Sequence, residues 1–213
     1  MPALLGTIHA LGLVSCFALL GTSRIGACIR WLSLQGIIFG LVPIVTDDAF
    51  GLRVMLLAGG NIALKGIIFP WVLLRLRART GAPREVEPFV GFVSSILFGI
   101  VALGLSVWLA LELTPALPHA PFLMLETAIF VVSIGLFMII SRRSALMQVI
   151  GYLMLENGIF VFGVITVVET PLLVELGVLL DAFVAVFVMG IAIFHIHREF
   201  GSMDTDQLNA LRG

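Results

Sequence analysis

One apolar stretch, residues 145–168, reads ALMQVIGYLMLENGIFVFGVITVV and is long enough to cross a bilayer. It carries Glu156 near its middle, followed at once by Asn157. A carboxylate at that depth is costly, so another group must compensate for it. Two further apolar stretches have the same feature, because residues 172–196 contain Asp181 and residues 52–74 contain Lys65. We therefore expect a fold that tolerates three ionisable groups inside a membrane.

The composition indicates the class of fold. Of the 213 residues, 60% are hydrophobic and 12% are charged, and this charged fraction is about half that of soluble proteins. The sequence predicts an all-α, polytopic transmembrane helix bundle of about seven spans, over residues 3–21, 28–46, 52–74, 89–112, 121–141, 145–168 and 172–196. A net charge of −1 and the lack of a recognisable binding motif exclude a nucleic-acid partner.

The arginines predict the orientation of these spans. Alternate turns carry Arg24 and Arg30, the arginines of residues 75–84, and Arg142 with Arg143, whereas the intervening turns are mainly acidic. Basic residues accumulate on the cytoplasmic side of membrane proteins. We therefore expect the N-terminus to lie outside the cytoplasm and the C-terminus to lie inside it.

Glu156 and Asp181 are the strongest candidates for chemistry. Each lies about halfway along its span, and successive spans are antiparallel, so both acids are expected near mid-membrane. Two carboxylates close together there cannot both stay ionised and titrate as a coupled pair, which can take up and release protons. The alternative is that each acid is a neutral, hydrogen-bonded packing residue.

Lys65 is the only lysine in the chain. Asn61 precedes it by one helical turn on the same face, and Pro70 leaves a backbone carbonyl without its usual donor. A buried amine can alternate between charged and neutral forms, so Lys65 is a candidate for proton transfer. The alternative is that its side chain extends to the cytoplasmic interface.

Other polar residues carry weaker signals. Glu126 and Glu175 lie near the outer ends of their spans, where each is either solvated or part of an outward proton path. His9 in the first span is either a hydrogen-bonded packing residue or part of the same path. Cys16 and Cys28 have no CxxC spacing, so we expect this chain to bind no metal and no cofactor.

Four motifs together resemble a known family, the membrane component E of hydrogenase-4, found in formate hydrogenlyase-type group 4 nickel–iron hydrogenases. They are LKxxxxP at residues 64–70, QVIGYLMLENG at 148–158, LVELGVLLDAFVAVFVMGI at 173–191 and DTDQLNALRG at 204–213. Residues 121–213 also resemble the K-type subunit of complex I and the C subunit of Mrp-type antiporters. The match is direct at Glu156 and looser at Asp181, because the second acid of the K-type subunit lies about one helical turn away.

The resemblance implies two regions: a four-helix transmembrane region at residues 1–113, and a K-type three-helix region with a short cytoplasmic tail at residues 114–213. It also implies a non-catalytic subunit of an oxidoreductase complex in a bacterial or archaeal cell membrane. The expected partners are antiporter-like membrane subunits, an H-type membrane subunit and lipid. Peripheral hydrogenase-like subunits would hold the nickel–iron site and the iron–sulfur clusters.

The function implied is redox-driven translocation of protons or sodium ions through buried ionisable residues. The expected proton relay is Glu156, Asp181 and Lys65, with access through Glu126, Glu175 and His9 and support from Asn157 and Asn61. An alternative is a structural membrane spacer that links antiporter-like subunits to the redox arm. A stand-alone transporter is disfavoured because the sequence has no obvious internal repeat.

Overall fold

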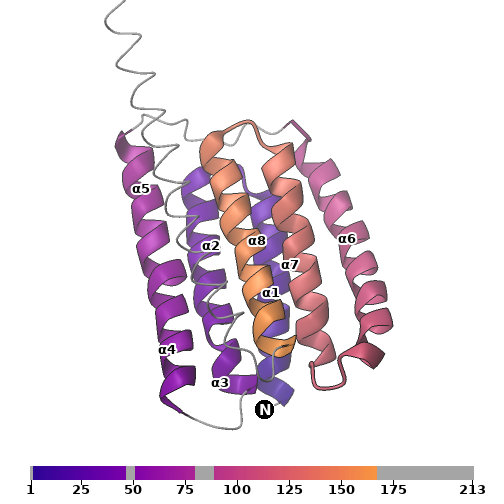
Figure 1. The fold of residues 1–213 in the computed structure, drawn as a ribbon. Coiled ribbons are helices and arrows are strands. Elements are labelled where there is room, and N and C mark those ends of the chain that lie inside the picture. Colours follow the sequence, from indigo (N-terminus) through magenta and orange to yellow (C-terminus); the bar gives the residue numbers. More distant parts are fainter. Residues whose placement is uncertain (1, 47–50, 80–88, 167–213) are drawn as a thin grey trace, which may run out of the picture.

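The computed structural model describes residues 2–46, 51–79 and 89–166, and these residues form a bundle of transmembrane helices (Figure 1). Six helices within these residues are long and apolar enough to cross a membrane. They span Ala3–Gly21, Ile25–Thr46, Val54–Ala78, Phe92–Ala116, Phe122–Ser141 and Ala145–Thr166. The predicted all-α membrane bundle is confirmed, and the seventh predicted span, residues 172–196, lies outside the described residues.

A proline interrupts the second span. The chain begins with α1 (Pro2–Gly21), followed by α2 (Ile25–Gly40) and the short α3 (Val42–Thr46). The break between α2 and α3 is explained by Pro43, which has no N–H to donate to the carbonyl group of Phe39.

The third span changes its helical pitch midway. It consists of α4 (Leu52–Asn61), the π-helix η1 (Ile62–Ile68) and α5 (Phe69–Arg79). Since α5 continues to Arg79, Arg75 and Arg77 lie on a helix, whereas the sequence predicted that this span ends at residue 74.

The second half of the described chain contains three long helices. They are α6 (Phe92–Leu113), α7 (Phe122–Ser141) and α8 (Ala145–Thr166), and the short 3-10 turn η2 (Thr114–Ala116) follows α6. All three are apolar on most of their surface. An apolar segment in lipid forms a helix because a helix satisfies its backbone hydrogen bonds within the segment itself.

Glycines allow α7 and α8 to pack closely. A Cβ atom on Gly135 of α7 would lie 2.5 Å from the backbone nitrogen of Leu155, and one on Gly158 of α8 would lie 2.8 Å from that of Val132. Small residues are the usual means of such approach in membranes. Helices α1, α7 and α8 form the centre of the bundle, with α6 at one side and α4–α5 at the other (Figure 1).

Candidate functional site

A lysine–glutamate ion pair lies in the middle of the bundle. The Nζ atom of Lys65 on η1 is 3.2 Å from Oε1 of Glu156 on α8. The two side chains are only 5% and 2% exposed, so the surrounding helices remove both charges from the surface. Each charge compensates the other, and Lys65 is thus the partner that the depth of Glu156 requires.

The backbone around Lys65 is held by α2. Pro70 has no N–H, so the carbonyl group of Gly66 lacks the donor that an α-helix would supply. The hydroxyl group of Ser33 on α2 donates to this carbonyl oxygen instead. A Cβ atom on Gly36 would lie 2.9 Å from the backbone of Lys65, so a glycine is needed where α2 approaches η1.

Two residues on one face of α8 contact the ammonium group of Lys65. Besides the carboxylate of Glu156, the ring of Phe160 lies one turn further along, with its centroid 5.2 Å from Nζ of Lys65. The space beside the pair is lined by Leu32, Lys65, Phe69, Leu153 and Asn157. The ion pair is a direct contact between two buried side chains.

A buried hydrogen-bond network links this pair to α1 and α2. Asn157 donates from Nδ2 to Oε1 of Gln35 at 3.2 Å, and Gln35 donates from Nε2 to the hydroxyl group of Ser15 at 3.0 Å. Ser15 in turn donates to the carbonyl oxygen of Gly12. Each of the three side chains is at most 1% exposed. Because Asn157 is adjacent to Glu156, this network fixes the rotation of α8 that directs the carboxylate toward Lys65.

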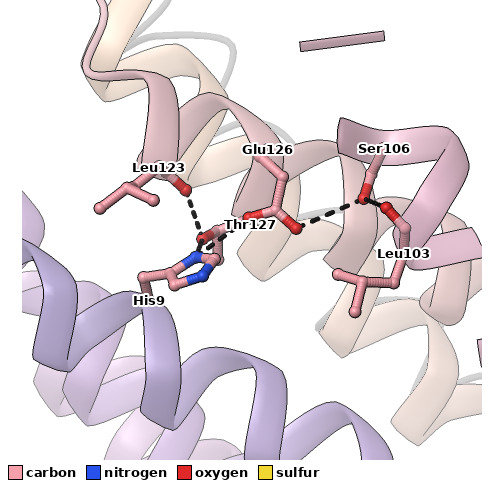
Figure 2. A network of polar contacts seen from close by, with 6 residues as sticks. All are labelled: His9, Leu103, Ser106, Leu123, Glu126 and Thr127. Carbon is pink, nitrogen blue, oxygen red and sulfur yellow. Dashed lines mark hydrogen bonds and ion pairs between the residues drawn. The ribbon is translucent and has the colours of Figure 1, made fainter. Parts of the chain in front are cut away.

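A second ionisable cluster joins α1 to α7 (Figure 2). Nδ1 of His9 lies 3.0 Å from Oε2 of Glu126 and 2.8 Å from the hydroxyl oxygen of Thr127. The hydroxyl group of Ser106 on α6 lies 3.5 Å from the other carboxylate oxygen of Glu126. Glu126 is 2% exposed, whereas His9 is 20% exposed, so the histidine is the member of the cluster that reaches the surface.

The structure decides several alternatives that the sequence left open. Lys65 is buried and paired, so the hypothesis that it extends to the interface is wrong. Glu126 is buried against His9, so the hypothesis that it is simply solvated is wrong as well. Asn61 donates to the carbonyl oxygen of Gly36 at 3.4 Å. Asp181 and Glu175 lie outside the described residues, so their predicted roles stay predictions.

Sequence reasoning missed Gln35, the central residue of the amide network. Its signal was present, because Gln35 is a polar residue near the middle of an apolar span. Cys16 is buried beside it, with Sγ 3.5 Å from Nε2 of Gln35. Within the described residues, no group of three His, Cys, Asp or Glu side chains is arranged to hold a metal ion.

Arg142 lies in the connection between α7 and α8, where the sequence indicated a charged turn residue, but its side chain does not face outward. Its side chain is fully buried and donates from Nη2 to the carbonyl oxygen of Leu20 at 3.1 Å, at the C-terminal end of α1. Burial lowers the pKa of this guanidinium from its ordinary value. The group therefore caps a helix end whose carbonyl groups attract a cation.

Comparisons with known proteins agree with the membrane architecture. The chain is 33% identical over 191 residues to the uncharacterized protein Rv0085 of Mycobacterium tuberculosis, a match that covers 87% of this chain and 86% of that protein. The chain belongs to the same family as Rv0085. Residues 123–213 match the family model of NADH-ubiquinone/plastoquinone oxidoreductase chain 4L, the K-type resemblance that the sequence predicted.

The predicted resemblance to hydrogenase-4 component E is confirmed too. Over 80 residues the chain is 39% identical to the Escherichia coli K12 protein of that name and, with the same identity, to the Shigella flexneri protein. Each match covers 38% of this chain and 37% of the relative. No solved structure shows a significant match. This chain is therefore a multi-pass membrane protein of the Rv0085 family, and its C-terminal part matches the chain 4L type.

Proposed function

We propose that this chain is a membrane-arm subunit of a group 4 nickel–iron hydrogenase-like respiratory complex and takes part in redox-driven proton translocation. The relationship to chain 4L and to hydrogenase-4 component E supports membership of a respiratory complex. The buried Lys65–Glu156 ion pair supports the role in translocation. Ionisable groups in a membrane interior are usually functional.

The proposed proton transfer uses the mutual dependence of the two charges. When Glu156 takes up a proton, an O–H bond forms, and the ammonium group of Lys65 loses the charge of this carboxylate. Loss of that charge destabilises the buried cation, so Lys65 then releases a proton or moves closer to another acid. Asp181, which the sequence places on the next span at similar depth, is the proposed second acid. A conformational change in the complex that separates Lys65 from Glu156 would thus drive proton uptake.

The remaining parts of the proposal concern partners and orientation. The nickel–iron site and iron–sulfur clusters would reside in peripheral subunits, and antiporter-like and H-type subunits would adjoin this chain in the membrane. Arg24, Arg30 and Arg143 support a cytoplasmic location for the end of the bundle at which α7 connects to α8, which leaves the N-terminus on the opposite side. Sodium remains the alternative ion.

The substitution Glu156→Gln in the intact complex tests the proposal. Glutamine keeps the volume and one acceptor oxygen but carries no proton to transfer. We expect proton translocation per electron to fall while electron transfer continues. Glu112→Gln, at the exposed C-terminal end of α6, is the matched control. Unchanged coupling in a fully assembled Glu156→Gln complex contradicts the proposal, and weakened assembly with unchanged coupling supports the structural spacer instead.

A further inference from the structure

The His9–Glu126 cluster is a candidate for a second proton-transfer site. It is built from three helices, since His9 lies on α1, Ser106 on α6, and Glu126 and Thr127 on α7 (Figure 2). The described residues place no lysine or arginine side chain in an ion pair with Glu126. A buried acid paired with a histidine is a composition suited to proton exchange.

Hydrogen-bond directions identify the nitrogen of His9 that carries a proton. The hydroxyl group of Thr127 donates to the carbonyl oxygen of Leu123 at 2.6 Å, so its hydrogen is already engaged. The contact of 2.8 Å between this hydroxyl oxygen and Nδ1 of His9 therefore has the histidine as donor. Nδ1 carries a proton beside Glu126, which leaves Nε2 as the ring nitrogen that can accept a second proton.

Glu126 has few hydrogen bonds for a buried carboxylate. Its Oε1 receives one long bond of 3.5 Å from Ser106, whose hydroxyl group also donates to Leu103 at 2.8 Å. Its Oε2 is buried and has no hydrogen-bond donor among the described residues, although Nδ1 of His9 lies 3.0 Å away. The carboxylate form thus depends on the charge of His9, and the two groups gain or lose their charges together.

The cluster lies nearer than the Lys65–Glu156 pair to the end of the bundle at which α1 and α7 begin. Because a Cβ atom on Gly158 would contact Val132 and Ala128, position 158 of α8 is level with residues 128–132 of α7. Glu126 then lies about 10 Å along the bundle axis from Glu156. The amide network of Ser15 on α1, Gln35 on α2 and Asn157 on α8 lies at the Glu156 end of this distance, since Asn157 is adjacent to Glu156.

We infer that His9 and Glu126 form the site through which protons enter the bundle from the end at which α1 begins. A hydronium ion transfers a proton to Nε2 of His9 and leaves as water, and Nδ1 then transfers its proton to Oε2 of Glu126: the Nδ1–H bond breaks, the O–H bond forms, and the ring becomes neutral with its hydrogen on Nε2. This first transfer needs only His9, Glu126 and water. Onward transfer to Glu156 rests on the proposed function and needs water molecules to enter between Glu126 and the amide network.

Infrared spectroscopy of the purified full-length chain tests the first transfer. After transfer into deuterated water, we expect the protonated carboxyl band that is lost in Glu126→Gln to shift rapidly in the wild-type protein. In His9→Gln, which retains a hydrogen-bonding side chain, we expect this shift to be at least about tenfold slower. Glu112→Gln is the matched control and leaves the band in place. An unchanged exchange rate in His9→Gln, or a band unaffected by Glu126→Gln, overturns the inference.

Proton translocation by the intact complex tests the onward step. Glu126→Gln and His9→Gln are each expected to slow translocation at least about tenfold, whereas Glu112→Gln leaves it unchanged. If Glu156→Gln uncouples the complex and Glu126→Gln does not, entry through Glu126 is wrong and the proposed function stands. If Glu156→Gln has no effect on coupling, the proposed function fails, and the infrared measurement alone decides whether His9 and Glu126 exchange protons.

Discussion

Lys65 and Glu156 form an ion pair of 3.2 Å across the interface between the third span and α8, although they are far apart in the sequence. Their helices meet because Gly36 lets α2 approach η1 and because Asn157 holds α8 through Gln35. Substitutions at the ion pair, at the close-packed glycines and at Gln35 therefore test how the bundle is held together.

Removing one member of the ion pair should cost more than removing both. Lys65→Met removes the cation beside the buried carboxylate of Glu156, and Glu156→Leu removes that carboxylate from the buried ammonium group, so we expect either to lower the free energy of unfolding by about 3 kcal/mol. The double variant replaces the pair by apolar side chains and should be close to the wild type in stability. Thermal unfolding in detergent checks this, and strictly additive losses in the double variant would contradict a direct interaction.

Gly135→Ala should disrupt the packing of α7 against α8. The added methyl group would lie 2.5 Å from the backbone nitrogen of Leu155, and the backbone cannot give way as a flexible side chain can. We expect a loss of about 1–3 kcal/mol of stability from this overpacking.

Gly104→Ala is the matched control for this substitution, since a Cβ atom on Gly104 of α6 meets nothing within 4 Å among the described residues. It should leave stability unchanged or slightly raised, because alanine favours a helix by about 1 kcal/mol relative to glycine. Equal unfolding temperatures for the two variants would show that α7 and α8 are not packed as described.

Gln35→Leu should destabilise the protein through its partners. The substitution leaves the amide group of Asn157 and the hydroxyl group of Ser15 without their shared partner in a buried site. We expect a loss of about 1–3 kcal/mol for these unsatisfied groups. Ser133→Ala is the control, since among the described residues its hydroxyl group bonds within α7, to Ile129. A Gln35→Leu protein as stable as Ser133→Ala would contradict the network.

Substitution of the adjacent arginines Arg142 and Arg143 should have very different effects on the stability of the protein. Arg142→Ala removes the buried guanidinium that binds the carbonyl oxygen of Leu20, and we expect a loss of about 2 kcal/mol of stability. Arg143 is exposed beside the ring of Phe89, so Arg143→Ala should change stability by less than about 1 kcal/mol. Comparison of the two unfolding temperatures checks this, and a larger effect at Arg143 would be the contrary result.

Much of the fold could be predicted from the sequence because hydropathy reports directly on spans in a bilayer. The number and approximate bounds of the six described spans followed from apolar runs, and Glu156 and Lys65 stood out as charges inside them. The extension of α5 to Arg79 was missed, because a helix that leaves the apolar region has no hydropathy signal to mark its end.

The partners of these charges could not be predicted, because apolar spans carry little information about which helix faces which. That costly groups lie inside the membrane could be read from the sequence alone, since insertion energy depends on residue type and depth. Only the tertiary structure decided that Glu156 meets Lys65 and that Glu126 meets His9. Those contacts depend on close approach at Gly36 and Gly135, and such packing between distant segments is set by three-dimensional fit.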